Sequence, residues 1–181
     1  MSLFIRCSAC KCIKPIGESS RNIDTGKHYC DDCMNGKTPV RPSWDSICMN
    51  TAIELAKRST CKTPDRQVGC VIVTSDYSSI EAWGYNGGPA GIDDTCDFNP
   101  DVKVGSRCNC AHAEMNAISK LDSTKHTDLI LYVTLQPCML CATLIVNTKS
   151  ISKVVYLDEY RDKRPLFILE EAGLKVRKFE P

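Results

Sequence analysis

The chain has 181 residues, of which 43% are hydrophobic, and its 23 lysines and arginines nearly balance 22 aspartates and glutamates. This composition is typical of a folded domain with a small appendage and excludes disordered and fibrous proteins. No apolar run approaches the roughly 18–20 residues that span a bilayer, and the first residues do not resemble a signal peptide. We therefore expect a cytoplasmic protein without a membrane partner. The net charge of +1 also argues against nucleic acid as a partner.

Cysteine is the exception in this composition. The chain contains 13 cysteines, an odd number that disulfides alone cannot pair. In a reducing compartment, clustered cysteines bind metal or take part in chemistry more often than they form bridges. The sequence therefore predicts metal sites.

The first cluster predicts a zinc-finger module over residues 1–36. Two C-x-x-C pairs, Cys7 with Cys10 and Cys30 with Cys33, have the spacing of a structural zinc site. Cys12 or His28 could replace one ligand. A segment this short buries little apolar surface on folding, so we expect a bound metal to stabilise it. The module resembles zinc-ribbon or treble-clef fingers, and its low charge favours a structural role or a protein contact over nucleic acid.

Residues 37–42 contain two prolines and predict a linker, after which residues 43–181 form the main domain. Ser43 is the expected N-cap of the first helix of this domain. Further helices are predicted over 111–121, 137–148 and 165–172, and strands over 68–74, 80–85, 129–135, 151–157 and 174–179. This alternation predicts an α/β fold with helices on both faces of a mostly parallel sheet.

Two short motifs carry the chemistry. The first is His112-Ala113-Glu114, and the second is Pro137-Cys138-Met139-Leu140-Cys141. One imidazole and two thiolates would hold zinc and leave its fourth position to water, as in catalytic zinc sites. Glu114 lies too close to His112 to share the ligand set comfortably, and is placed to transfer protons instead. Together the motifs predict a catalytic zinc centre of the deaminase type.

The segments HAEMNAI, YVTLQPCMLC, VGCVIV and GYNGGPAG resemble deoxycytidylate (dCMP) deaminases, from about Ser43 to the end of the chain. The resemblance implies a three-layer α/β/α cytidine-deaminase-like fold with a mixed, mostly parallel five-stranded sheet. It implies a hydrolase that converts dCMP to dUMP and ammonia and feeds dTMP synthesis. A finger joined to this domain looks viral, in which case the compartment would be the cytoplasm of an infected host.

The resemblance also implies the residues that bind nucleotides. Substrate would be held by Asn86, Arg66, Tyr160 and Arg161, with the two arginines facing the phosphate. Relatives of this kind are commonly homohexamers that dCTP activates and dTTP inhibits at a site between subunits, with Mg²⁺ accompanying the triphosphate. The residues that match this allosteric site are Asn86, Gly87, Gly91 and Lys120.

The remaining cysteines divide into two groups. Some relatives hold a further structural zinc in their loops, and the loop cysteines that could hold one here are Cys61, Cys96, Cys108 and Cys110. Cys48 and Cys70 fall on apolar faces of a predicted helix and strand, where they are expected to be buried.

Two other functions are compatible with these motifs. The first is a deaminase of cytosine or adenine in tRNA or single-stranded DNA, which would need a basic groove rich in aromatic residues. The net charge of +1 and an aromatic content of 7% offer little support for it. The second is a zinc-binding scaffold without catalysis that recruits a partner. The intact set of four site residues argues against it.

Overall fold

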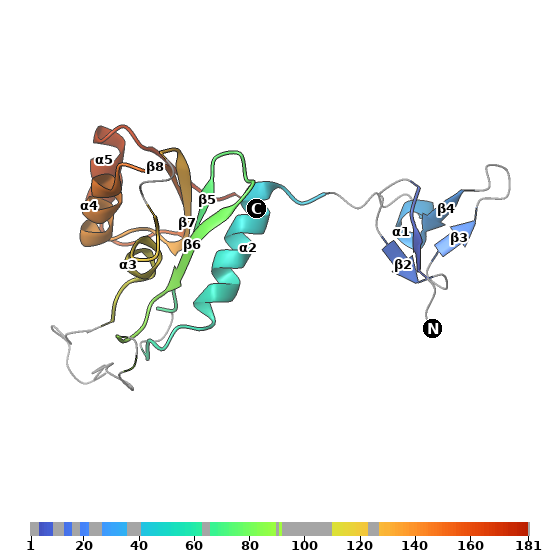
Figure 1. The fold of residues 1–181 in the computed structure, drawn as a ribbon, viewed down its shortest axis with the longest axis horizontal. Coiled ribbons are helices and arrows are strands. Elements are labelled where there is room, and N and C mark those ends of the chain that lie inside the picture. The colour runs from blue at the N-terminus through green and yellow to red at the C-terminus, as the bar shows by residue number, and fades with distance from the viewer. Residues whose placement is uncertain are drawn as a thin grey trace. The chain divides into compact units, whose positions relative to one another are not determined.

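The computed structural model describes residues 4–8, 13–15, 19–21, 27–35, 41–62, 66–89, 91, 110–122 and 127–180. The chain divides into two compact units, Met1–Pro42 and Ser43–Pro181 (Figure 1). The second unit begins with a helix whose N-cap is Ser43, as predicted. The Ser43 hydroxyl accepts a hydrogen bond from the backbone N–H of Ser46 at 3.1 Å.

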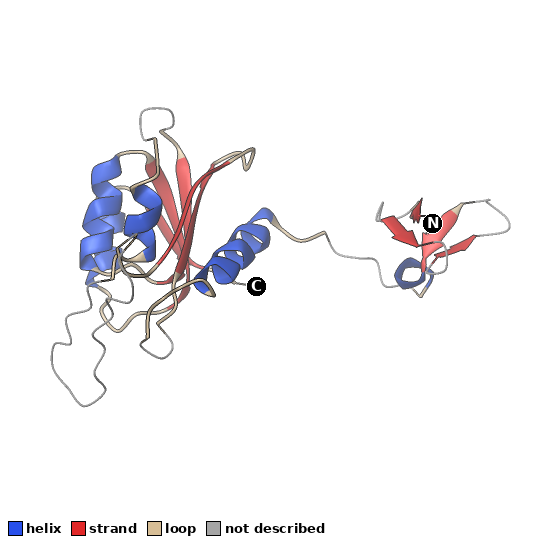
Figure 2. Cartoon of the chain, turned by 60° about the horizontal axis from the view of Figure 1, so that its bottom comes forward, coloured by secondary structure: helices blue, strands red, loops and turns tan. Residues whose placement is uncertain are grey.

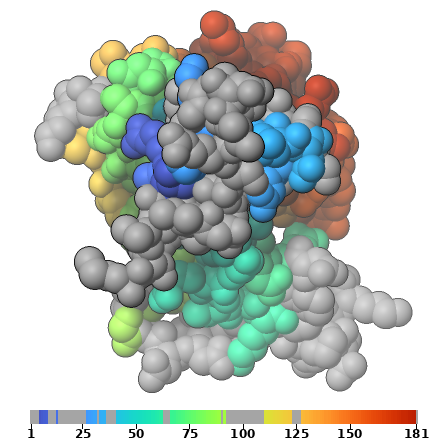
Figure 3. Space-filling model, turned by 90° about the vertical axis from the view of Figure 1, so that its right-hand side faces the viewer, coloured from blue at the N-terminus to red at the C-terminus, as the bar shows by residue number. Residues whose placement is uncertain are grey.

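The first unit contains two antiparallel hairpins and a short helix. Its elements are β1 (Phe4–Arg6), β2 (Ile13–Pro15), β3 (Ser19–Arg21), β4 (His28–Cys30) and α1 (Asp31–Met34). Strand β1 pairs with β2, and β3 pairs with β4. Among the described residues of this unit, whose surface is blue in Figure 3, the buried ones are Cys7 and Cys30. Both side chains that the structure shows to be buried in this unit are therefore those of cysteines.

The second unit is built around a five-stranded sheet. Its elements are α2 (Trp44–Ala56), β5 (Gly69–Thr74), β6 (Ile80–Tyr85), α3 (Ala113–Ile118), β7 (Leu129–Leu135), α4 (Met139–Thr148), β8 (Ile151–Asp158), α5 (Arg164–Glu171) and β9 (Lys175–Lys178). The strand order is β6-β5-β7-β8-β9. Strand β5 is antiparallel to β6 and to β7, whereas β7, β8 and β9 are parallel. The predicted mixed sheet is confirmed, with its parallel part confined to the last three strands.

Helices cover both faces of this sheet (Figure 2). Alternate residues of β5 separate the two cores: Val71 and Val73 pack with α2, whereas Cys70 and Ile72 pack with α3, α4 and α5. This arrangement is the predicted three-layer α/β/α fold. Among the described residues, no helix has the length and apolar character that crossing a membrane requires.

Two glycines let helices approach the strand backbone closely. A Cβ added at Gly84 of β6 would lie 2.3 Å from the carbonyl oxygen of Ala113, in α3. A Cβ added at Gly69 of β5 would lie 1.9 Å from the carbonyl oxygen of Ala52, in α2. Because both obstacles are backbone atoms, neither position has room for a side chain.

Two helices begin later than predicted. Helix α4 starts at Met139 rather than at residue 137, because Cys138 is extended and serves as the N-cap, its carbonyl accepting the N–H of Ala142 at 2.8 Å. Helix α3 starts at Ala113 rather than at residue 111, because Ala111 forms two backbone hydrogen bonds with Gly87. In both cases the residue before the helix is a predicted zinc ligand.

A polar network joins α2 to β9. The Asp45 carboxylate accepts hydrogen bonds from the hydroxyls of Tyr132 and Tyr77 and pairs with Nη2 of Arg177 at 2.5 Å. Burial alone would raise the pKa of Asp45, but the hydrogen bond from Tyr132 and the positive charge of Arg177 outweigh it. The pKa of Asp45 therefore lies below its usual value.

We expect Asp45→Ala to lower the free energy of unfolding of the second unit by about 2 kcal/mol at pH 7, because the buried Tyr132 hydroxyl loses its acceptor. Since the pKa of Asp45 is lower in the folded state, its carboxylate stabilises the fold above the unfolded pKa, near 3.8. That contribution fades as the pH falls through the folded pKa. Both tryptophans of the chain lie in this unit, so urea unfolding followed by their fluorescence measures it.

The same measurement at pH 7 and near pH 3.5 should show the difference between Asp45→Ala and the unsubstituted chain becoming smaller in acid. Glu170→Ala, at an exposed position of α5, is the control and should unfold like the unsubstituted chain. Equal stability of Asp45→Ala and the unsubstituted chain at pH 7 would contradict the role of the network.

Candidate functional site

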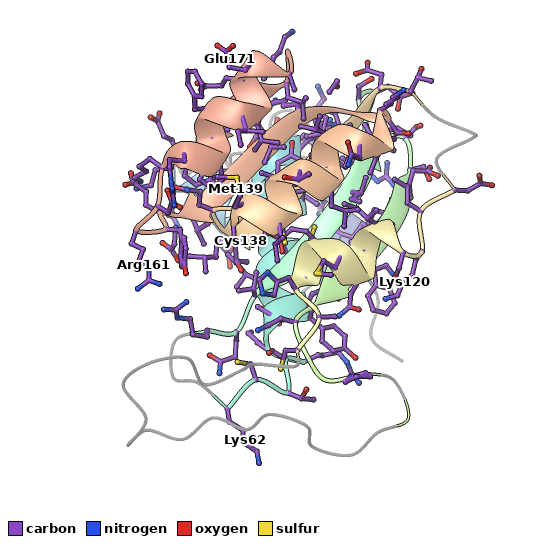
Figure 4. The ribbon with its side chains drawn as sticks, turned by 90° about the vertical axis from the view of Figure 1, so that its left-hand side faces the viewer. Lys62, Lys120, Cys138, Met139, Arg161 and Glu171 are labelled. Carbon is purple, nitrogen blue, oxygen red and sulfur yellow. The ribbon has the colours of Figure 1, made fainter. Side chains whose placement is uncertain are left out.

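Three potential metal ligands meet where α3 and α4 begin. His112 is the N-cap of α3, Cys138 is the N-cap of α4, and Cys141 lies in the first turn of α4. Nδ1 of His112 is 3.3 Å from Sγ of Cys141 and 3.4 Å from Sγ of Cys138. The three ligand atoms all lie within 4.8 Å of one another. Figure 4 shows Cys138 at the start of α4.

This spacing fits a zinc ion. With Zn–S near 2.3 Å and Zn–N near 2.0 Å, neighbouring ligand atoms of a tetrahedral site lie about 3.5 Å apart. The donors are two thiols and one imidazole nitrogen, the set that zinc prefers. Three protein ligands leave one position of the tetrahedron for water or substrate.

The three candidate ligands shift one another's pKa values. A hydrogen bond with Cys141 lowers the pKa of Cys138 to about 3. The same bond, together with burial, raises the pKa of Cys141. The hydrogen bond with Cys138 also raises the pKa of His112. Because zinc binds thiolates and neutral imidazole, metal binding at this site would displace the protons that these groups carry.

Glu114 is the second residue of α3, in its first turn, and faces the same sulfur atoms. Its side chain is only 4% exposed, and its carboxyl group interacts with the Cys141 thiol. Burial raises the pKa of Glu114 to about 6, above its usual value of 4.5. A buried carboxyl with a pKa close to neutral can both accept and donate a proton.

A second group of predicted residues gathers around one aromatic ring. The guanidinium carbon of Arg66 lies 5.7 Å from the centre of the Tyr160 ring, and that of Arg161 lies 5.8 Å from it. The structure thus brings together residues that are about 95 positions apart in the sequence. Figure 4 shows Arg161 on the same side of the unit as Cys138. Two positive charges therefore lie against one aromatic ring.

Residues 42–158 match the family model described as the cytidine and deoxycytidylate deaminase zinc-binding region. The chain belongs to this family. It is 38% identical over 169 residues to the deoxycytidylate deaminase of Saccharomyces cerevisiae, covering 87% of this chain and 52% of the yeast protein. It is 38% identical over 152 residues to the human deoxycytidylate deaminase, covering 76% of this chain and 80% of the human one. It therefore spans about half the length of the yeast relative and most of the human one.

A solved structure agrees with this assignment. The dCMP deaminase of cyanophage S-TIM5, in complex with dCMP and dUMP, superimposes with a TM-score of 0.65 at 30% identity. The alignment covers 77% of this chain and 99% of the phage chain. The resemblance to dCMP deaminases and the cytidine-deaminase-like fold, both predicted from the sequence, are confirmed.

Asn86, a predicted nucleotide contact, is engaged with the segment between α2 and β5. Its Oδ1 accepts hydrogen bonds from the Ser59 hydroxyl and the Val68 N–H, both at 2.7 Å. Its Nδ2 donates to the carbonyl of Arg66 at 2.7 Å. Asn86 thus fixes the backbone that carries Arg66, and the predicted contact with nucleotide would have to use the second Nδ2 hydrogen.

Of the predicted allosteric residues, Asn86, Gly87 and Gly91 follow β6, whereas Lys120 follows α3 and contacts β6. Lys120 donates a hydrogen bond to the carbonyl of Trp83 at 3.0 Å, and its amine lies 4.0 Å from the centre of the Trp83 ring. It follows α3, at the opposite end of that helix from His112 (Figure 4). Gly87 pairs with Ala111, and Gly91 has a positive φ of 79°.

The other cysteines are described in part. Cys48 and Cys70 are buried, as predicted. Of the loop cysteines considered for a further zinc, Cys61 and Cys110 are buried, whereas Cys96 and Cys108 lie outside the described residues.

In the finger, the sulfur atoms of Cys7, Cys30 and Cys33 lie within 4.8 Å of one another. The backbone N–H of Cys30 donates to Sγ of Cys7 at 3.4 Å. Cys10 and Cys12 lie outside the described residues, and the group that the structure does bring together does not include His28.

Sequence reasoning missed Gln136. It is 2% exposed and hydrogen-bonds the segment that carries Tyr160 and Arg161. The available signal was a polar residue at the end of an apolar strand, directly before the PCxxC motif.

Proposed function

We propose that the chain catalyses the hydrolytic deamination of dCMP to dUMP and ammonia. The observation that carries this proposal is the convergence of His112, Cys138 and Cys141 beside the buried carboxyl of Glu114. The family relation supports it, because the relatives described above are named deoxycytidylate deaminases and the phage enzyme binds both dCMP and dUMP.

The proposed roles follow from the chemistry of these side chains. His112, Cys138 and Cys141 hold zinc, which when bound acts as a Lewis acid and lowers the pKa of water. Glu114 accepts a proton from the attacking water and passes it to N3 of the cytosine ring, and then carries the second proton of that water to the amino group that leaves C4 as ammonia. Its pKa of about 6 suits both transfers.

We assign recognition of the 5′-phosphate to Arg66 and Arg161. Both guanidinium groups lie against the Tyr160 ring, and a monophosphate needs charged donors of this kind. Tyr160 itself is placed to border the nucleotide. Asn86 supports the proposed phosphate site, because its Nδ2 donates a hydrogen bond to the carbonyl of Arg66.

One assay tests the proposed activity. Purified full chain loaded with zinc is given dCMP, a cytosine-containing oligonucleotide or tRNA, and both ammonia and the nucleotide product are measured. We expect ammonia and dUMP in equal amounts from dCMP. Turnover of polynucleotide without turnover of dCMP would favour the polynucleotide alternative. No turnover of any substrate would favour the non-catalytic scaffold.

We also propose that the first unit binds a structural zinc through Cys7, Cys10, Cys30 and Cys33. Three of these sulfur atoms already lie together, and the N–H donated to Cys7 stabilises a thiolate there. Cys10 completes the set by its C-x-x-C spacing. Because the buried described residues of this unit are cysteines, zinc would contribute much of its folding free energy.

Metal analysis of the full chain should find two zinc ions per chain, and a third would support a site that includes Cys61 and Cys110. Cys141→Ser and Cys33→Ser should each lower the zinc content by one ion, because each removes a thiolate from a different site. Cys48→Ser is the control, since Cys48 is a buried cysteine outside both groups, and its zinc content should not change. Full zinc content in Cys33→Ser would exclude the finger site.

We propose, from the family resemblance, a homohexamer that Mg²⁺-bound dCTP activates and dTTP inhibits, with contacts from Asn86, Gly87, Gly91 and Lys120. Light scattering coupled to gel filtration measures the assembly. Activity assays with dCTP and dTTP measure the regulation. A monomer whose activity ignores both triphosphates would contradict this part of the proposal.

A further inference from the structure

We infer that Gln136 is a positioning residue that sets the Tyr160–Arg161 segment at a fixed place relative to the zinc ligand Cys138. This inference rests on the proposed function, because it assigns Gln136 a part in holding the 5′-phosphate of dCMP. The hydrogen bonds of the Gln136 side chain go to Tyr160, Asp162 and Lys163 rather than to the proposed metal ligands or the two arginine side chains.

The contacts of Gln136 converge on one short segment, the loop between β8 and α5. Nε2 of Gln136 donates to the carbonyl of Asp162 at 2.6 Å. Oε1 accepts from the backbone N–H of Tyr160 at 3.3 Å and from Nζ of Lys163 at 3.4 Å. The Gln136 N–H also donates to the carbonyl of Asp158 at 2.8 Å. The amide thus holds the backbone on both sides of Arg161.

Burial makes the hydrogen bonds of Gln136 stronger than the exposed ion pairs of the β8–α5 loop. Gln136 is 2% exposed, so its hydrogen bonds are shielded from water. The ion pair of Lys163 with Glu159 and that of Arg164 with Asp162 both involve strongly exposed basic side chains, and exposed pairs of this kind contribute little. We therefore assign the fixed position of the loop to Gln136.

The position of Gln136 in the chain links the β8–α5 loop to the proposed zinc site. Gln136 follows the last residue of β7, a central strand of the sheet, and stands two residues before Cys138. Only Pro137 separates it from the metal ligand. The residues that bind the phosphate must lie at a fixed distance from the reacting carbon. Small displacements of bound groups lower the rate or the affinity substantially. Asn86 holds the carbonyl of Arg66 in a comparable way.

The test compares steady-state kinetics with dCMP in Gln136→Met, which keeps the length of the side chain and loses its hydrogen bonds. We expect KM to rise about tenfold or more with kcat changed less than about threefold, because contacts to a group remote from the reaction bind ground state and transition state alike. Arg161→Ala should raise KM similarly. The double variant should raise it little further, since both changes remove the same contact.

Thr134→Val is the matched control. Thr134 lies on β7, is buried, and accepts a hydrogen bond from the N–H of Gly69 rather than from the β8–α5 loop. It should lose stability and keep the KM of the unsubstituted chain. If Gln136→Met folds poorly, Gln136→Glu keeps the acceptor for Tyr160 and loses the bond to Asp162, and we expect an intermediate KM.

Several outcomes would overturn the inference. These are an unchanged KM, an equal loss in kcat, or a double variant whose KM rises by the product of the single effects. Failure of the proposed function is a separate result, because the unsubstituted chain would then not convert dCMP at all.

Discussion

Glu114→Gln should lower kcat for dCMP by about 10³-fold while leaving the zinc content and the fold unchanged. Glutamine has the shape of glutamate but can no longer accept and return a proton, and general acid–base catalysis of this kind contributes roughly 10²–10⁴-fold. Because Glu114 is 4% exposed, water cannot easily take over its role. Three measurements decide the case: dUMP formation, zinc per chain and the urea midpoint.

The matched control is Glu54→Gln. Glu54 forms an exposed ion pair with Lys57 at 2.6 Å on α2, so this substitution should change neither turnover nor zinc content. If Glu114→Gln kept activity within about tenfold of the unsubstituted chain, proton transfer would have to be assigned to another group. If it lost zinc instead, Glu114 would belong to the metal site rather than to proton transfer.

Gly84→Ala should strongly destabilise the second unit. Its Cβ would meet the carbonyl oxygen of Ala113 at 2.3 Å and the N–H nitrogen of Ala117 at 2.6 Å. Both atoms belong to the backbone of α3, so the helix has to move as a whole. Overpacking of this kind costs about 3 kcal/mol. Because His112 is the N-cap of α3 and Glu114 lies on this helix, we also expect loss of activity and of the catalytic zinc.

Gly69→Ala separates these two effects. Its Cβ would lie 1.9 Å from the carbonyl oxygen of Ala52, so that α2 moves instead of α3. Helix α2 carries none of the proposed zinc ligands. We expect a similar loss of stability, measured by urea unfolding, with the zinc content of the folded fraction retained. Equal zinc loss in both variants would show that zinc binding depends on the stability of the whole unit rather than on the position of α3.

The metal ligands could be predicted because their pattern is local. His112 and Glu114 are two residues apart, and Cys138 and Cys141 three, so each pair is visible in a short stretch of sequence. The strands of the sheet were visible for the same reason, as apolar runs between turns. The arginine pair was found through the family resemblance, and no periodicity links Arg66 to Arg161.

Contacts across long stretches of sequence could not be predicted. The side-chain partners of Gln136 lie 24 to 27 residues further along the chain, and those of Asn86 up to 27 residues earlier. A side chain's partners at such distances depend on the order of strands in the sheet. The antiparallel pairing of β5 with β7 also depends on that order, since the strands are far apart in sequence. The start of α4 was also not predictable. The proline at position 137 indicated a helix beginning there, but the extended backbone of Cys138 places the first helical residue at Met139.

The hydroxyl of Ser43 gives the second unit a helix start of its own. The Ser43 hydroxyl accepts its hydrogen bond from the N–H of Ser46, three residues later and within the same unit. A cut or fusion in the linker predicted over residues 37–42 would therefore leave the N-cap of helix α2 in place.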